Sequence, residues 1–449
     1  MPEAGPRRHV LAVGAVIMVI QLVRIIQRGV GDFKLHWTIG GYLIRGEFLY
    51  GNAGWYRGYG GTDFPYPPIW GIVHAPLALF PRAVAQTLLY PLYLIAFVVL
   101  LEVLNRLSLP HLPVDRKRKF WLTTAAVVLA SRFLIRDLPE CGVNLALVAM
   151  AWGAVLLWRA RRDRLGAVVL GTATALKCTP ALFIAWFLWK RQWRIASWSA
   201  AVALAMSVAP ALVLGPTEFT RTTAFWMHNL YRGASQTDPL ESTLGPVSVQ
   251  NMSLKGALAR YLMHVPEGHR SRLAGPLHID FLELDAETAR LTINLLFLVA
   301  GVGVLALYRF RAGRNEESML WEAAGISLMI LLLSPITWGQ HCVGVLPALF
   351  LLVRAHDSGR PLERWMYAFV GVWAFVLLGL NRGFVGREFT LLLDSYRLQT
   401  WLIAGLLGVT LRCRALCLRP EWASASPHIE HSDVTPKIVP LSRPAAEHS

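Results

Sequence analysis

Long apolar runs separated by short charged segments recur along almost the whole chain. A run of roughly 20 apolar residues as a helix spans the ~30 Å hydrocarbon layer of a bilayer. The first such run, His9–Gln27, is a full span, and because no small-residue cleavage site follows it we expect an anchor rather than a signal peptide. Further spans are predicted near residues 83–107, 119–136, 143–159, 196–214, 290–308, 318–335, 341–355, 365–381 and 396–412.

The charged segments between these runs are mainly basic. Cytoplasmic loops are enriched in lysine and arginine, so the basic clusters orient the chain. With a cytoplasmic N-terminus, segments 28–68 and 215–288 become two long outer-face loops, and residues 420–449 become a disordered cytoplasmic tail. Residues 1–419 then form one transmembrane domain. The clusters that set this orientation are Arg116–Lys119, Arg159–Arg162, Lys190–Arg194, Arg309–Arg311 and Arg412–Arg414.

The apolar stretch 165–189 has two readings. As a single span it would place the basic cluster 190–194 outside, against the positive-inside tendency. As two short helices bent at Lys177–Pro180 it keeps both flanking clusters inside, and Pro180 favours a break because it lacks a backbone N–H and clashes with the preceding turn. We prefer this re-entrant or broken hairpin. The chain is then an all-α integral membrane protein, a helical bundle of about twelve membrane segments.

Composition agrees with a lipid environment. Of 449 residues 55% are hydrophobic and 16% charged, whereas soluble proteins carry about a quarter charged residues. The net charge of +16 comes from clusters that suit anionic headgroups, so we expect no nucleic-acid partner. The five cysteines lack metal-ligand spacing, and neither a metal nor another cofactor is expected.

Polar and aromatic residues gather on the predicted outer side. A transporter would carry its ionisable groups near the midplane among broken helices. A layer at one face instead indicates a site for substrates at the membrane interface. Four segments stand out: Gly31–Trp37 with Asp63–Pro68 in the first outer loop, Ala175–Pro180 at the tip of the predicted hairpin, Asn251–Leu254 with Arg260 in the second outer loop, and Ser334–His341.

In this order the four segments resemble the pattern of glycosyltransferase family 87, over residues from about 10 to 355. The matching elements are an aspartate–aromatic pair after the first span followed by Tyr-Pro-Pro, a Lys-x-x-Pro hairpin, an Asn-x-Ser-Leu element and a Ser-Pro-x-x-Trp-x-x-His element. There are departures. Gln340 stands where a histidine is usual, Met252 replaces a glutamine, and Gly142 stands in place of a glutamine.

The resemblance implies a GT-C-type fold with its active site on the outer face. It also implies a polyprenyl-phosphate sugar as donor, commonly mannose, and Asp32 as catalytic base. The expected acceptor is a cell-envelope glycolipid or polysaccharide. The protein would be a multi-pass protein of the plasma (inner) membrane, active on its periplasmic or extracytoplasmic face.

An inverting single displacement needs one carboxylate to deprotonate the acceptor hydroxyl, unlike the paired carboxylates of glycoside hydrolases. Asp32 is the predicted base, although an aspartate there could also cap the following helix. His341 is the second predicted catalytic residue, placed to donate to the leaving phosphate or to hold the acceptor. An interfacial histidine that only hydrates a helix end is the alternative for His341.

Lys177 could attract the donor phosphate as a point charge, or it could pin the hairpin. Arg260 could clamp the phosphate with its guanidinium, or it could be a solvated arginine. The remaining predicted donor ligands are Tyr66, Asn251, Asn144 and Gln340, and the predicted acceptor ligands are Asp63 and His36. A transporter or flippase of lipid-linked glycans, or a non-catalytic scaffold of an envelope complex, remains the alternative to a transferase.

Overall fold

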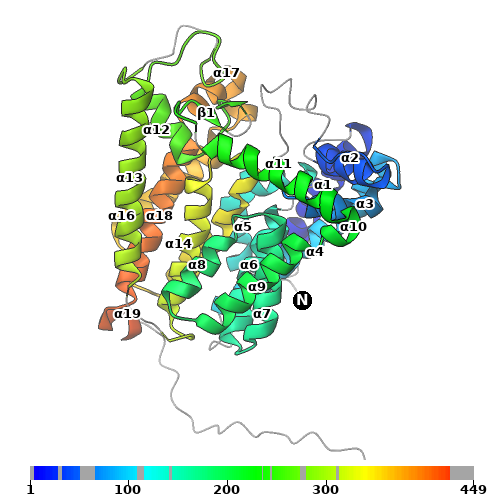
Figure 1. Ribbon diagram of the computed structural model, residues 1–449. Coiled ribbons are helices and arrows are strands. Elements are labelled where there is room, and N and C mark those ends of the chain that lie inside the picture. Colours follow the sequence, from blue (N-terminus) through cyan, green and yellow to red (C-terminus); the bar gives the residue numbers. More distant parts are fainter. Residues whose placement is uncertain are drawn as a thin grey trace, which may run out of the picture.

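The computed structural model describes residues 5–28, 33–50, 66–108, 116–140, 144–234, 236–242, 245–273, 280–309 and 313–424 (Figure 1). The first half of this region consists of helices α1 (Gly5–Arg28), α2 (Phe33–Ile44), α3 (Ile69–Ala78), α4 (Arg82–Ser108), α5 (Arg116–Glu140), α6 (Asn144–Arg159), α7 (Asp163–Leu176), α8 (Ala181–Trp189), α9 (Trp193–Val208) and α10 (Ala211–Leu214).

The second half is also mainly helical. Its elements are α11 (Pro216–Ala234), β1 (Glu241–Ser242), β2 (Gly245–Pro246), α12 (Leu254–Leu262), α13 (Ala286–Leu307), α14 (Glu317–Leu333), η3 (His341–Val345), α15 (Leu346–Asp357), α16 (Arg364–Ala374), η4 (Phe375–Gly379), α17 (Arg382–Ser395), α18 (Leu398–Leu416) and α19 (Pro420–Ser424). The two short strands pair antiparallel, with Glu241 opposite Pro246 and Ser242 opposite Gly245.

Four of the described helices are long and apolar enough to cross a membrane: α1, α4, the α9–α10 stretch and α13. The central windows of these helices are only 11–28% buried, so most of their apolar surface faces outward. Such bands of exposed apolar surface suit lipid and not water. The pair α16–η4 and α17 makes a fifth candidate, bent by 102°. The predicted spans at 9–27, 83–107, 196–214 and 290–308 coincide with the four long helices, whereas the count of about twelve stays a prediction.

Helix α14 lies at the centre of the bundle. Most of its side chains are buried, and it packs along α18 and beside α15 and α8. Its sequence is apolar on every side, which is the composition of a helix surrounded by other helices. Trp152 of α6 donates from Nε1 to Oγ of Ser327 at 3.0 Å and joins the two halves of the bundle.

Helices α7 and α8 are separated at Lys177–Pro180, the position where the sequence predicts a bend. The start of α7 and the end of α8 both contact Trp158 at the end of α6. Arg314 bridges the Trp158 carbonyl to Asp163 at the start of α7, and the ring of Phe187, near the end of α8, lies 5.3 Å from the Trp158 ring between centroids. The start of α7 and the end of α8 therefore lie on the same side of the bundle, and Lys177, at the break between the two helices, lies at the opposite tip.

Close helix contacts need glycine at two positions. A Cβ on Gly40 of α2 would lie 2.4 Å from the carbonyl oxygen of His74 in α3, and a Cβ on Gly171 of α7 would lie 2.6 Å from that of Ser199 in α9. Only glycine lets the backbones approach so closely. The contact at Gly40 holds the short helix α3, ten residues long, against α2 instead of across a membrane.

Two regions differ from the sequence-based expectation. Segment 215–288, predicted as a long loop, contains α11, the β1–β2 hairpin and α12 (Figure 1). These amphipathic helices were not predicted, because their mean hydropathy is too low to mark them as membrane spans. The predicted disordered tail begins with α19, in which Trp422 is 2% exposed and donates to Glu317. The rest of the tail, residues 425–449, lies outside the described residues.

Candidate active site

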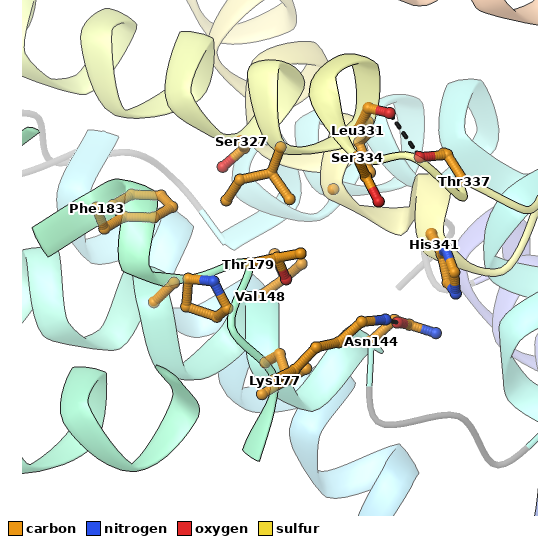
Figure 2. A pocket seen from close by; sticks show the side chains of 15 residues that line it. Asn144, Val148, Lys177, Thr179, Phe183, Ser327, Leu331, Ser334, Thr337 and His341 are labelled. Atoms are coloured by element: carbon orange, nitrogen blue, oxygen red, sulfur yellow. Dashed lines mark hydrogen bonds between the residues drawn. The ribbon is translucent and has the colours of Figure 1, made fainter. Parts of the chain in front are cut away.

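A partly open cavity lies between α6, the α7–α8 break, α14 and η3 (Figure 2). Its polar end carries Asn144, Lys177 and His341, and Figure 2 shows Phe183 and Ser327 on the opposite side from His341. The remaining lining residues are Leu147, Val148, Ala151, Thr179, Pro180, Ile330, Leu331, Ser334, Thr337 and Gly344. The cavity is therefore amphipathic, with a charged polar end and a mostly apolar remainder.

Lys177 lies at the tip of the α7–α8 pair. Its backbone is extended, with φ −151° and ψ 125°, so its side chain leaves the helical path. Nζ of Lys177 donates to Oδ1 of Asn144 at 2.9 Å and lies 5.7 Å from the centroid of the Tyr66 ring. The cation thus lines the cavity between an amide and an aromatic face.

Asp137, near the end of α5, fixes the orientation of Asn144. The Asn144 amide donates from Nδ2 to Oδ1 of Asp137 at 3.0 Å, and the backbone N–H of Leu145 donates to Oδ2 at 3.3 Å. A carboxylate accepts and does not donate, so the amide must turn its oxygen toward Lys177. Asp137 and Asn144 in this chain are buried, and Lys177 at its end is half-buried.

His341 enters the cavity from the turn that links α14 to η3. The backbone N–H of Trp338 donates to its Nδ1 at 3.2 Å, so a neutral ring carries its proton on Nε2. Asn251 supports this turn from behind: its Nδ2 donates to the Pro335 carbonyl at 3.1 Å, and its Oδ1 accepts from the N–H of Thr337 at 3.0 Å. Asn251 therefore positions the turn and does not line the cavity, in contrast to its predicted role as a donor ligand.

Beyond Lys177 lies a cluster of aromatic rings. His36 lies 5.0 Å from Tyr66, 4.5 Å from Trp70 and 4.9 Å from His74, measured between ring centroids. Burial, then the neighbouring His74 and the Lys177 charge, hold the pKa of His36 well below its usual value. His36, predicted as an acceptor ligand, is fully buried in this cluster and does not line the cavity.

Arg260 and Gln340 also lie outside the cavity lining. The Arg260 guanidinium is fully buried, 3.5 Å from Asp280 and 4.5 Å from the centroid of the Tyr396 ring. Burial and the Asp280 carboxylate leave it poorly placed for the predicted phosphate clamp. Gln340, beside His341, is 2% exposed. Asp32 and Asp63 lie outside the described residues.

Among the described residues, no three His, Cys, Asp or Glu side chains converge into a group able to hold a metal ion. Two residues that sequence reasoning did not select complete the site. Asp137 orients Asn144, and Trp70 donates from its indole to the Leu176 carbonyl, next to Lys177. The available signal for Asp137 was its charge at the outer end of the predicted span 119–136. For Trp70 the only signal was its place after Tyr-Pro-Pro.

The fold and the cavity define a class: a multi-pass helical membrane protein with an amphipathic cavity that carries a lysine and a histidine at its polar end. The family model of Glycosyltransferase family 87 matches residues 64–335, more than half of the chain. The chain belongs to glycosyltransferase family 87 and is an enzyme of the mannosyltransferase type. The matched region includes Tyr66, Asn144 and Lys177 and excludes Asp32 and His341.

Curated relatives come from mycobacteria. The chain is 28% identical over 349 residues to a polyprenol-phosphate-mannose-dependent alpha-(1-2)-phosphatidylinositol mannoside mannosyltransferase of Mycolicibacterium smegmatis, covering 75% of this chain and 72% of the relative. The protein of the same description from Mycobacterium tuberculosis is 27% identical, with 73% and 71% covered. A pentamannoside mannosyltransferase of M. smegmatis is 27% identical, with 71% and 67% covered. No solved structure matches the chain.

Proposed function

We propose that this enzyme transfers mannose from a polyprenyl-phosphate-mannose donor to a glycolipid or polysaccharide of the cell envelope, on the non-cytoplasmic face of the plasma membrane. The observation that carries the proposal is the amphipathic cavity with Lys177 and His341 at its polar end. The curated relatives, named for this donor and for phosphatidylinositol mannoside acceptors, support the same substrate pair.

The reaction is an inverting single displacement. Asp32 takes the proton of an acceptor hydroxyl, whose oxygen forms the new bond to the anomeric carbon of the donor sugar. The bond from that carbon to the phosphate oxygen breaks, and polyprenyl phosphate leaves with the bonding electron pair. Asp32 immediately precedes Phe33, the first residue of α2, and its role as base rests on the family resemblance.

Lys177 stabilises the departing phosphate. Negative charge grows on the leaving oxygen in the transition state, so a preoriented cation lowers the barrier more than it favours the ground state. Asn144 holds the ammonium at 2.9 Å, and Asp137 holds Asn144. Little reorganisation is then needed when charge develops. His341 lies at the same end of the cavity, where its ring can contact the phosphate.

The apolar part of the cavity suits the first isoprenoid units of the donor. Phe183, Ile330 and Leu331 line this part, and burial of apolar surface is favourable by roughly 25 cal/mol per Å². A phosphate at Lys177 and an isoprenoid chain along these side chains would match both halves of the cavity.

Transfer of radiolabelled mannose tests the proposal. Purified full-length protein in detergent is given synthetic polyprenyl-phosphate-mannose and phosphatidylinositol mannoside, alongside Asp32→Asn. We expect labelled product from the wild-type chain and a loss of at least 100-fold in kcat for the variant, since proton transfer to a positioned base contributes about 10²–10⁴-fold. Undiminished transfer by Asp32→Asn would remove the base assignment. A folded wild-type protein that uses no polyprenyl-phosphate sugar would refute the function.

A further inference from the structure

A second group of cations lies toward the end of α5. Arg132 and Arg136 are one helical turn apart, and the next residue, Asp137, belongs to the chain that holds Lys177. Arg132 is half-buried and Arg136 is exposed. Both lie close enough to interact electrostatically with each other and with Asp394 of α17. We name Arg132, Arg136 and Asp394 the arginine patch.

The described contacts of the two arginines leave most of their donors for a ligand. Arg132 donates one long hydrogen bond of 3.4 Å to the Leu380 carbonyl, and Arg136 donates to the Gln250 side chain at 3.2 Å. Within the described part of the chain neither guanidinium has a carboxylate at ion-pair distance. Each guanidinium carries five N–H donors in a fixed fork, so the pair can offer several bonds to one anion.

Charge around the patch is unbalanced. Asp394 accepts a hydrogen bond from Gln399 at 2.9 Å and faces Arg397 as well as the two patch arginines. Arg397 is 2% exposed and already donates to the Val249 carbonyl. Three guanidinium groups thus face a single carboxylate. Cations held near one another and partly desolvated favour an anion between them.

The neighbouring surface suits a lipid. The axis turns by 102° between α16–η4 and α17, so α17 runs across the direction of the preceding helix. It exposes Phe384 at 80% and Phe389 at 44%. Aromatic side chains beside a cationic patch at a helix end are the arrangement expected where headgroups meet acyl chains.

The patch also abuts the turn that carries His341. Cδ of Arg136 lies 2.9 Å from where a Cβ on Gly339 would be, two residues before His341. A lipid whose phosphate binds Arg132 and Arg136 would therefore have its sugar next to the turn between the patch and the cavity. Glycine at 339 gives Arg136 the room to lie there.

We propose that the arginine patch binds the phosphodiester of an anionic glycolipid acceptor, as an anion site separate from that of the donor phosphate at Lys177. This inference rests on the proposed function, because only that function makes the bound lipid the acceptor. The ligand class is a phosphate-bearing lipid glycoside, and a neutral glycolipid with the same sugar should not use the site.

Kinetics with two matched acceptors test the site. Full-length protein is assayed with phosphatidylinositol mannoside and with mannosyl diacylglycerol, which lacks the phosphate. We expect Arg132→Gln and Arg136→Gln each to raise KM for the phosphatidylinositol mannoside about tenfold, since loss of one charged hydrogen bond has about this effect. KM for the neutral acceptor and for the donor should stay within about twofold, and Arg136→Lys should recover part of the loss.

Arg387→Gln is the matched control, because Arg387, like Arg136, is an exposed arginine, but it lies on α17 and outside the patch. An equal effect of this control would mean that surface charge alone attracts the lipid, and would overturn the site. Equal changes for both acceptors, no change for either, or a raised donor KM would overturn it as well.

Equilibrium binding of each lipid without donor separates this inference from the proposed function. Wild-type protein should prefer the phosphate-bearing lipid, and Arg136→Gln should lose that preference. If the wild-type chain transfers no mannose but shows this preference, the proposed function fails and the anion site stands. If it binds both lipids equally, the site fails whatever the transfer assay gives.

Discussion

Two lysines flank helix α8, and they have opposite surroundings. Lys190, at its end, is 4% exposed and lies 2.8 Å from the Glu322 carboxylate, which Arg414 and the Trp186 indole also contact. Lys177, before its start, donates to the amide of Asn144 and lines a cavity. One lysine is neutralised by a buried carboxylate, and the other is presented to a space that a substrate can enter.

The difference separates a structural role from a functional one. The Glu322 cluster joins α8, α14 and α18, so it fixes the base of the α7–α8 pair. A fixed base limits the movement of the opposite tip, where Lys177 lies. Sequence alone predicts two costly cations near a membrane. It does not show which cation is paired with a carboxylate.

The largest expected effect is on the structural side. Glu322→Gln leaves Lys190 and Arg414 buried without their shared carboxylate, and breaking such a pair destabilises by about 3–5 kcal/mol. We expect a large fall in the thermal unfolding midpoint in detergent. Glu102→Gln is the control, because Glu102 is exposed and pairs with Arg106, and surface pairs contribute only ~0.2–1 kcal/mol. Equal stability of the two variants would contradict the assignment of Glu322 as a structural centre.

Exchanging each lysine for methionine tests the comparison directly. Lys177→Met should lower kcat/KM by about 10²–10³-fold, the usual effect of removing one transition-state donor, with little change in unfolding midpoint. Lys190→Met should lower the midpoint while the folded fraction keeps its activity, because Arg414 still neutralises Glu322. Folded-fraction activity and thermal unfolding are measured on both. If both variants lost only stability, Lys177 would be structural as well.

A smaller effect should follow from the residues behind Lys177. Asp137→Asn and Asn144→Ala each remove part of the chain that orients the ammonium, so we expect kcat/KM to fall about 10–100-fold, as for a charged hydrogen bond of ~1.5–3 kcal/mol. Asp285→Asn is a matched control. Asp285 also accepts a backbone N–H at a helix start, but it lies at α13, away from the cavity. Equal activity losses in Asp137→Asn and Asp285→Asn would mean that Asp137 only caps a helix and does not orient Lys177 for catalysis.

Local patterns predicted the parts of this site that local chemistry determines. Pro180 predicted the break beside Lys177, and in the structure α7 ends at Leu176 and α8 begins at Ala181. The Ser334–His341 motif predicted that His341 is a site residue, and the structure brings it to the same cavity as Lys177.

Long-range contacts were beyond reach of the sequence. No periodicity links Asn144 to Lys177, which lies 33 positions later, or Trp70 to Leu176, which lies 106 positions later. The same limit applies to Asn251, whose amide donates to Pro335 and accepts from Thr337 in the turn behind the cavity. Motif position identified it as part of the site, but only packing shows that it supports the turn.

The smallest expected effect concerns pH and again distinguishes the two lysines. Burial lowers the pKa of His74 to about 4, and the pKa of His36 is lowered as well. An unfolded histidine titrates near pH 6.5, so between about pH 6.5 and 4 the unfolded chain binds more protons than the folded one. Stability contributed by the neutral rings is therefore complete above about pH 6.5 and is lost as the pH falls toward 4. At pH 5 the loss of stability caused by His74 alone is about 2 kcal/mol.

Thermal unfolding between pH 7.5 and 5 measures this loss, and His74→Gln should reduce it. Lys177→Met should reduce it slightly, because the Lys177 charge is one of the causes that lower the pKa of His36. Lys190→Met should keep the wild-type slope, since its partners are Glu322 and the Tyr308 carbonyl and not the histidine cluster. A slope that changed with Lys190 and not with Lys177 would mean that the histidines respond to the bundle as a whole, and the proximity of Lys177 to His36 would have no energetic consequence.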